Sequence, residues 1–140
     1  MSVSRPLPDP DADSAPFWEA ARRGELRVQR CAECGARRHP PRPMCPRCRC
    51  MRGEWERLSG RGRIYSFVVC HAPVLPAFQE RVPYAVVLVE LAEDPGLRLV
   101  GNLLDAGPEA LRIGQPVQVV FEDVGEDVVL PQWRPVPGLG

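Results

Sequence analysis

The chain has 140 residues, of which 44% are hydrophobic, and its 18 arginines balance 18 acidic residues to a formal net charge of zero. This length suits one ordinary domain or two very small ones, and the composition is that of a folded globular protein. The longest apolar runs are strand-sized, far below the roughly 20 residues that a spanning helix needs, and no secretory signal precedes the cysteines. We therefore expect a cytoplasmic protein without a membrane segment.

The charge is divided unevenly along the chain. Residues 17–63 carry a formal charge of +8, whereas residues 64–140 carry −6. A basic segment of this kind is either an anion-binding surface or a solvated polar surface that attracts the acidic half. Charge alone leaves both interpretations open.

The N-terminal region predicts a tail followed by a short helix. Residues 1–13 are rich in Pro and Asp and show no apolar period, which predicts a disordered tail. Ser14 can cap a helix that begins there, and Gly24 supplies its exit. Phe17 and Trp18 give this helix its apolar surface, so we expect it to dock on this chain or on another one.

Two Cys-x-x-Cys pairs follow, with ten residues between them. They are Cys31/Cys34 and Cys45/Cys48. Each pair directs two sulfurs at one point, and together they predict a four-thiolate zinc site, a zinc ribbon. Four thiolates fill a tetrahedral zinc ion, so the site is expected to be structural. Two disulfides are the alternative, which a reducing cytosol disfavours.

The residues after each pair are not equivalent. Gly35 follows the first pair where the chain turns back under the metal, but Arg49 occupies the matching place after the second pair. If this place needs a positive φ angle, Arg49 holds it at a cost of about 1 kcal/mol or more. Cys50 lies two residues past Cys48, a spacing that aims its sulfur less favourably, so we expect it to stay outside the site.

The remaining pattern is mainly β. Short ribbon strands are predicted at residues 26–30, 37–41 and 54–58, and the two glycines of residues 59–62 mark a hinge. Five longer strands are predicted at residues 63–71, 84–91, 97–104, 117–122 and 128–133, with one short helix at residues 105–111 and turns at residues 93–96 and 125–127.

Three strands, a helix and two more strands are the order of a five-stranded OB-fold barrel. The predicted domains are therefore the helix with the zinc ribbon at residues 14–58 and the barrel at residues 59–136, followed by a tail at residues 137–140. The strand at residues 84–91 is apolar on both faces, so Val86 and Leu88 or their alternates need a cover from the ribbon, a helix or a partner.

A series of short motifs then points to a family. In chain order the motifs are Phe17-Trp18-Glu19, Gln29-Arg30-Cys31-x-x-Cys34-Gly35, Pro40-Pro41-Arg42, Cys45-Pro46-x-Cys48, Glu54-Trp55, Ser59-Gly60-x-Gly62-x-Ile64-Tyr65-Ser66-Phe67, Pro83-Tyr84, Ile113-Gly114 and Val119-Val120-Phe121-Glu122. Over about residues 16–136 their order and spacing resemble the zinc-ribbon OB-fold family catalogued as domain of unknown function 35. Arg49 departs from the family's usual glycine.

The resemblance implies a fold and a role. The implied fold is an N-terminal helix and a rubredoxin-like zinc ribbon packed on an OB-fold barrel. The implied role is a non-catalytic accessory subunit of thiolase-like enzymes in lipid or steroid metabolism, such as acyl-CoA acetyltransferases, hydroxymethylglutaryl-CoA synthases and side-chain aldolases. Some relatives are associated with MaoC-like hydratases, and the family is thought to bind acyl-CoA.

Specific residues suit that role. Arg37, Arg38 and Arg42 lie between the two cysteine pairs and could bind the phosphates of coenzyme A, although they could equally be solvated or face an acidic patch of the barrel. Phe17 and Trp18 could shelter a pantetheine arm or contact a partner enzyme, and the alternative is that they cover the barrel.

No catalytic constellation is visible in the sequence. His39 and His71 are the two histidines, and neither lies in a motif that pairs it with a nucleophile, so we expect structural histidines and no enzyme activity. Nucleic-acid binding is the rival function, but the acidic barrel half has few aromatic residues. Iron in the same four thiolates, as in rubredoxin, is a third alternative.

Overall fold

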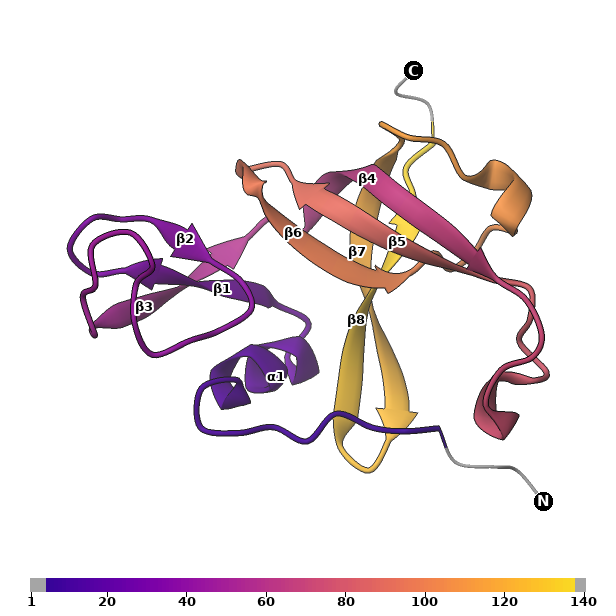
Figure 1. Ribbon diagram of the computed structural model, residues 1–140, viewed down its shortest axis with the longest axis horizontal. Coiled ribbons are helices and arrows are strands. Elements are labelled where there is room, and N and C mark those ends of the chain that lie inside the picture. Colours follow the sequence, from indigo (N-terminus) through magenta and orange to yellow (C-terminus); the bar gives the residue numbers. More distant parts are fainter. Residues whose placement is uncertain (1–4, 138–140) are drawn as a thin grey trace.

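The computed structural model describes residues 5–137 and contains two sheets with one helix against both (Figure 1). The elements are α1 (Ala15–Arg22), β1 (Leu26–Cys31), β2 (Arg37–Arg38), β3 (Gly53–Leu58), β4 (Arg61–Cys70), β5 (Tyr84–Leu91), β6 (Asp94–Asn102), β7 (Pro116–Gly125) and β8 (Val128–Pro135), with 3₁₀ turns at Pro76–Phe78 and Pro108–Ala110. In the described part of the chain, no helix has the length and apolar character that a bilayer crossing requires.

The predicted tails lie partly outside this description. Residues 1–4 and 138–140, which belong to the tails predicted at residues 1–13 and 137–140, are not among the described residues. Residues 5–10 form neither helix nor strand, and Arg5 donates to the carboxylate of Glu122 in β7 over 3.3 Å.

Helix α1 begins differently from the prediction. Ser14 occupies the N-cap position, but its hydroxyl makes no cap bond to the helix. Instead, Ser14 and Asp11 bond reciprocally, because the Asp11 N–H donates to Ser14 Oγ over 3.0 Å and the Ser14 N–H donates to Asp11 Oδ1 over 2.8 Å. The predicted exit is confirmed, since Gly24 has a φ of +76°.

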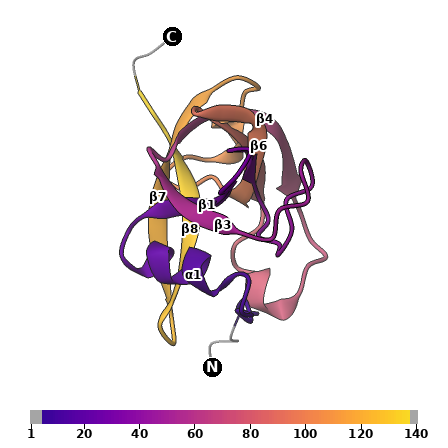
Figure 2. The ribbon, with the colours of Figure 1, turned by 90° about the vertical axis from the view of Figure 1, so that its left-hand side faces the viewer.

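The ribbon sheet has the strand order β2-β1-β3 and is antiparallel throughout. Strand β2, at the edge of this sheet, is shorter than the strand predicted at residues 37–41, since it holds only Arg37 and Arg38. Pro40 and Pro41 follow after His39, and they have no N–H to donate to a ladder. In Figures 1 and 2, α1 lies between this sheet and the β7–β8 hairpin, where it buries Phe17, Ala20 and Ala21.

The second sheet has the order β6-β5-β4-β7-β8 and curls so that its ends meet. A parallel bridge between Leu103 and Trp133 joins the β6 side to β8, which closes the predicted OB-fold barrel. Fully buried apolar side chains fill it. The largest in the barrel are Trp133, Ile64, Val87, Val89 and Val117.

Two connections differ from the predictions. The helix predicted at residues 105–111 is only the 3₁₀ turn Pro108–Ala110, because Leu111 takes an extended backbone and buries its side chain in the core. The turn predicted at residues 93–96 is at Ala92 and Glu93 instead. Pro95 is part of β6, an edge strand of the hydrogen-bonded sheet, where its missing N–H is tolerated.

The two hinge glycines do different things. Gly60 has a φ of +79° and packs so closely on Val119 that a Cβ would collide with it. Gly62 has no positive φ, but a Cβ there would collide with the backbone of Glu90 in β5. Gly60 therefore makes the bend, whereas Gly62 allows the close approach of two strands.

The outer face of β5 stays partly uncovered. Val86 and Leu88 are half-buried, whereas the buried residues Ala85, Val87, Val89 and Leu91 face the core. Their cross-strand neighbours on the same face, Val68 in β4 and Val100 in β6, are 58% and 60% exposed. An apolar outer sheet face therefore remains at the surface, consisting of Val68, Val86, Leu88 and Val100.

Candidate functional site

The four predicted cysteines converge at the end of the ribbon. The sulfurs of Cys31, Cys34, Cys45 and Cys48 all lie within 4.8 Å of one another. The Cys31–Cys48 and Cys34–Cys45 pairs of Sγ atoms are 3.4 and 3.6 Å apart. A tetrahedron with Zn–S bonds of about 2.3 Å has edges of about 3.8 Å, so the cage has the size that zinc requires.

Backbone N–H groups prepare the sulfurs of Cys31 and Cys45 for a cation. The amides of Glu33 and Cys34 lie 3.4 and 3.5 Å from Cys31 Sγ, and the amide of Arg47 lies 3.4 Å from Cys45 Sγ. The bonds from Cys34 and Glu33 lower the pKa of Cys31 to about 6. Deprotonation, which metal binding demands, is thereby favoured at neutral pH.

The two metal-binding turns have the same backbone conformation. Gly35 and Arg49 have φ angles of +74° and +67°. Their N–H groups donate to the carbonyls of Cys31 and Cys45 over 3.1 and 3.0 Å. The positive φ predicted at Arg49 is confirmed, and it costs about 1 kcal/mol relative to a glycine.

Cys50 lies outside the cage. Its sulfur contacts the backbone of Arg52, accepting from the N–H over 3.3 Å, and it is not one of the four clustered thiols. Its carbonyl, by contrast, accepts the N–H of Cys45 over 2.9 Å. Cys50 therefore supports the second turn through its backbone.

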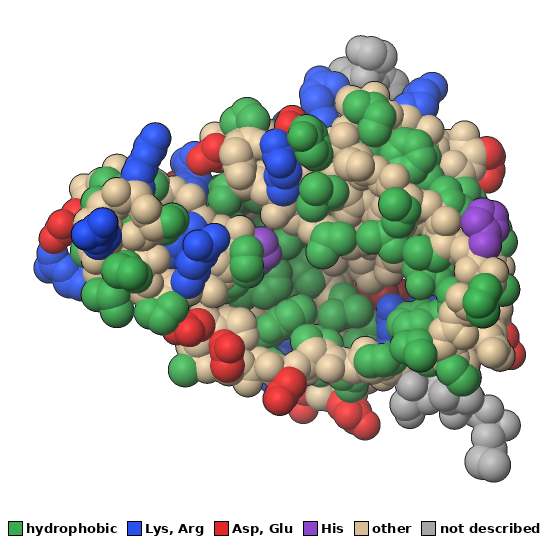
Figure 3. Space-filling model, in the orientation of Figure 1, with side chains coloured by type: hydrophobic (Ala, Val, Ile, Leu, Met, Phe, Trp, Pro, Cys, Tyr) green, Lys and Arg blue, Asp and Glu red, His purple; other side chains and the backbone are tan. Residues whose placement is uncertain are grey.

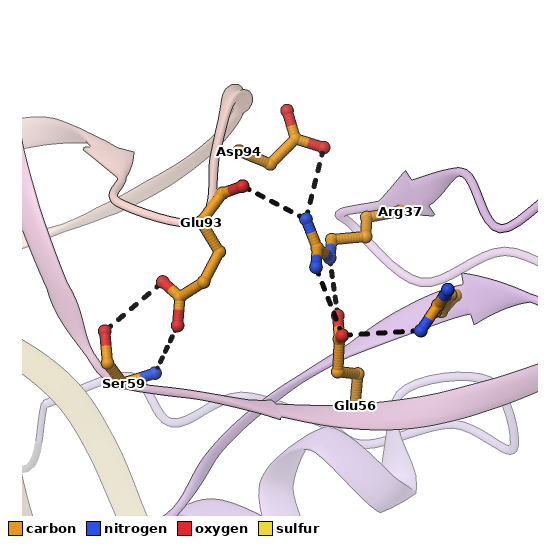
Figure 4. Close-up of polar contacts among 6 residues, drawn as sticks. Arg37, Glu56, Ser59, Glu93 and Asp94 are labelled. Carbon is orange, nitrogen blue, oxygen red and sulfur yellow. Dashed lines mark hydrogen bonds and ion pairs between the residues drawn. The ribbon is translucent and has the colours of Figure 1, made fainter.

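Arg37, one of the predicted phosphate-binding residues, joins the ribbon to the barrel (Figure 4). Its guanidinium pairs with Glu56 in β3, with a distance of 3.1 Å between NH2 and Oε1, and donates to the carbonyl of Glu93 over 3.1 Å. The Glu93 carboxylate accepts from the N–H and hydroxyl of Ser59. The bonds and charge of Glu56 raise the pKa of Arg37, and Arg37 in turn lowers the pKa of Glu56.

The other two ribbon arginines differ from each other. Arg38 is only 5% exposed, and its guanidinium donates to the carbonyl of Arg42 over 3.0 and 3.2 Å. The Arg42 N–H donates to Gln29 over 2.7 Å, while its side chain is in no ion pair within residues 5–137. Phosphate binding by these residues stays a prediction, which the internal contacts of Arg37 and Arg38 disfavour.

The two aromatic residues of α1 are also unequal. Phe17 is 6% exposed and belongs to the core, where its ring packs 5.1 Å from that of His39. This burial disfavours the predicted partner contact for Phe17. Trp18 stays partly exposed, with its ring edge-on to Phe17 at 5.0 Å, so its predicted contact remains open.

The histidines are separated by the fold. Burial lowers the pKa of His39 to about 4, and its Nδ1 has no hydrogen-bond partner among the described residues. His71 is exposed, contrary to the structural role expected for it. The two side chains therefore do not form a catalytic pair.

Comparison with known proteins identifies the family. Residues 18–49 match the family described as the ChsH2 rubredoxin-like zinc ribbon domain, and residues 55–122 match the ChsH2 C-terminal OB-fold domain. A DUF35 domain-containing scaffold protein of Methanocaldococcus jannaschii is 40% identical over 101 residues, covering 70% of this chain and 68% of that protein. The chain belongs to the DUF35 family.

A solved structure and a longer relative extend the comparison. The DUF35 chain is similar to a chain in the structure of an Ltp2-ChsH2(DUF35) aldolase, with a TM-score of 0.84 and 41% identity over 91% of this chain and 98% of that one. It is also 42% identical over 131 residues to a probable enoyl-CoA hydratase alpha subunit of Thermomonospora curvata, covering 94% of this chain. It spans about two fifths of the length of the curated hydratase subunits that it matches.

The geometry limits what this DUF35 metal site can do. The cage fits a structural zinc ion, held by Cys31, Cys34, Cys45 and Cys48. Four thiolates leave no coordination position for water or substrate, so the ion supplies cohesion to the ribbon and no Lewis-acid chemistry.

Proposed function

We propose that this chain is a non-catalytic accessory subunit that binds a thiolase-like aldolase or a related acyl-CoA enzyme and helps to position the acyl-CoA. The observation that carries the proposal is the closed four-cysteine cage, which makes the ribbon a rigid support and not a reactive centre. The similarity to a chain of an Ltp2-ChsH2(DUF35) aldolase supports an aldolase as the partner. The similarity to hydratase alpha subunits supports a hydratase, of the MaoC-like type, as an additional associate.

The side chains support a role without catalysis. Within residues 5–137, neither histidine is hydrogen bonded to a serine or cysteine that it could activate. His39 is held neutral by burial, which suits packing better than proton transfer near neutral pH.

The surface supports a protein partner. The apolar outer sheet face places Val68 and Val100 more than half exposed over adjoining strands. Figure 3 also shows a hollow with many apolar side chains between the ribbon and the barrel. Adjoining apolar side chains at the surface are typical of sites where another protein binds.

Co-purification tests this proposal. The chain is co-expressed with a candidate aldolase and a candidate hydratase, and aldolase activity is assayed for the chain alone, the enzyme alone and both together. We expect no turnover by the chain alone and a stable complex that is more active than the enzyme alone. Robust turnover by the isolated chain, or full enzyme activity without it, contradicts the proposal.

A matched pair of variants locates the contact. Val100→Glu charges the apolar outer sheet face, whereas Leu75→Glu charges an equally exposed apolar residue elsewhere, since Leu75 is 59% exposed. We expect the first variant to weaken the complex at least about tenfold, because it buries an unpaired carboxylate at the interface, and the second to have little effect. If both variants weaken the complex equally, or neither does, the partner does not bind at the apolar outer sheet face.

A further inference from the structure

A second group of arginines surrounds a groove at the end of the barrel. The groove has a volume of about 1360 Å³, and four arginines line it together with Glu90 and Asp105. The four arginines are Arg61, Arg63, Arg112 and Arg134. The lining residues therefore carry an excess of positive charge, although residues 64–140 as a whole are acidic.

The strand register places three of these arginines on one sheet face. Arg61 in β4 is opposite Gln118 in β7, and Gln118 is opposite Arg134 in β8. Arg63 lies two residues along β4 from Arg61, so it points to the same side. Because neighbouring strands are about 4.8 Å apart, the backbones of Arg61 and Arg134 are separated by about 10 Å, a gap that two arginine side chains can span towards one ligand.

These guanidinium groups are free to bind an anion. None of the ion pairs among residues 5–137 includes any of the four groove arginines. Arg63 donates one N–H to the carbonyl of Gly114 over 3.0 Å, and its side chain remains exposed. This contrasts with Arg37 of the ribbon, whose guanidinium is occupied by the Glu56 carboxylate and the Glu93 carbonyl.

The rest of the lining indicates an amphipathic ligand. Pro116, Pro135 and Val136 supply apolar walls. Gln115 Oε1 is buried and has no hydrogen-bond partner among the described residues, so it can accept from a ligand N–H or O–H. Among residues 5–137, no Phe, Trp or Tyr lines the groove, which disfavours single-stranded nucleic acid because it binds by stacking its bases on aromatic rings.

We propose that this arginine groove binds a small organic ligand that carries at least two phosphate groups and an apolar or amide-bearing remainder. Arginine suits phosphate because its planar guanidinium donates two parallel N–H bonds to one phosphate. The coenzyme A part of a thioester has this chemistry, so the inference rests on the proposed acyl-CoA role and adds the place where the phosphates bind.

The test measures binding of defined probes to the full chain by calorimetry. The probes are adenosine 3′,5′-bisphosphate, inorganic pyrophosphate and coenzyme A, each at low and high salt. We expect saturable binding of adenosine 3′,5′-bisphosphate that weakens with salt, and tighter binding of coenzyme A because its arm reaches the apolar walls. Pyrophosphate binding as tight as that of coenzyme A would contradict the proposed apolar contribution.

Variants separate the groove from the ribbon. Arg112→Ala combined with Arg134→Ala should weaken coenzyme A binding about tenfold or more, because the phosphates lose charge-assisted hydrogen bonds. Both arginines are exposed, so the fold should persist, which circular dichroism checks. Arg42→Ala in the ribbon and Arg81→Ala, an exposed arginine outside the groove, should change affinity by less than about twofold.

Several results would overturn the inference. They are no binding of any phosphate probe, loss of binding in the Arg42 variant but not in the groove variant, and tighter binding of a glutamate-rich peptide or of an oligonucleotide than of coenzyme A. If the groove variant loses coenzyme A but still forms the enzyme complex, the groove is supported separately from the partner contact. If the complex never forms while groove binding persists, only the proposed function fails.

Discussion

The ribbon and the barrel keep their folds by different means and use arginine differently. The ribbon has a small apolar contribution to the core, chiefly Leu26, Val28 and Leu58, so the zinc cage and ion pairs of β1–β3 must hold its outer end together. The barrel has a continuous apolar core and needs no metal. Arg37 and Arg38 of the ribbon therefore serve the fold, whereas we propose that the four groove arginines bind a ligand.

Breaking the metal cage gives the largest expected effect. Cys45→Ser removes a buried ligand, and we expect the loss of zinc and of the ribbon structure, because structural zinc contributes about 10–16 kcal/mol to such folds. Two-dimensional NMR should show ribbon signals lost and barrel signals retained. Cys50→Ser is the matched control and should keep one zinc per chain; loss of zinc in this control would contradict the placement of Cys50 outside the cage.

Opening a cavity in the barrel gives the next largest effect. Trp133 is fully buried, so Trp133→Ala should lower the free energy of unfolding by about 3–5 kcal/mol in a denaturant titration. Zinc content should not change in the folded variant, since no ligand lies in the barrel. Val100→Ala, at a site 60% exposed, should cost under about 0.5 kcal/mol, and a similar cost for both changes would refute the difference in packing.

The stability of the chain should fall in acid because of His39, which packs on Phe17 of α1. The pKa of His39 is about 4 in the folded chain and lies below its ordinary value of 6.5, so the unfolded chain takes up the proton first as pH falls. The stability that neutral His39 contributes to the folded chain is fully present above pH 6.5. It is lost as the pH falls from 6.5 to 4, by up to about 3 kcal/mol in the free energy of unfolding.

The matched variants isolate this contribution from acid release of the metal. His39→Phe should flatten the loss of stability between pH 6.5 and 4 when unfolding is measured at several pH values, whereas His71→Phe, at an exposed site, should leave the curve unchanged. An unaltered curve for His39→Phe would show that the buried imidazole is not responsible.

The Arg37–Glu56 ion pair within the ribbon should give the smallest effect. Arg37 and Glu56 are both about one quarter exposed, so their coupling should be about 1 kcal/mol in a double-mutant cycle of Arg37→Met and Glu56→Gln. Arg57, whose side chain is 61% exposed and pairs with Glu25, supplies the control cycle with an expected coupling near zero. Equal coupling in both cycles would remove the special role of Arg37.

Much of the fold could be predicted because its signals are local. The spacing of the cysteines, the apolar strand at residues 84–91 and the order of the strands depend on near neighbours in sequence, and the structure agrees with them. The positive φ of Arg49 was predictable for the same reason, by analogy with Gly35. The prediction of a helix at residues 105–111 was wrong because burial of Leu111 overrides the local helix signal.

The grouping of the four groove arginines could not be predicted from the sequence. The charge count grouped Arg61 and Arg63 with the basic segment of residues 17–63, although the predicted barrel begins at residue 59, and both lie in β4 of the barrel. They meet Arg112 and Arg134 only because β4, β7 and β8 adjoin, which no local pattern reveals. Similarly, the burial of Phe17 and the hydrogen bond from Arg37 to the Glu93 carbonyl depend on elements distant in sequence.

X-ray absorption at the zinc edge of the purified full-length chain tests the closed metal cage most directly. We predict one zinc per chain with four sulfur neighbours at about 2.3 Å and no oxygen or nitrogen neighbour. A bound water, a site with fewer than four sulfurs, or a correctly folded ribbon without metal would contradict the claim that this cage is a purely structural support.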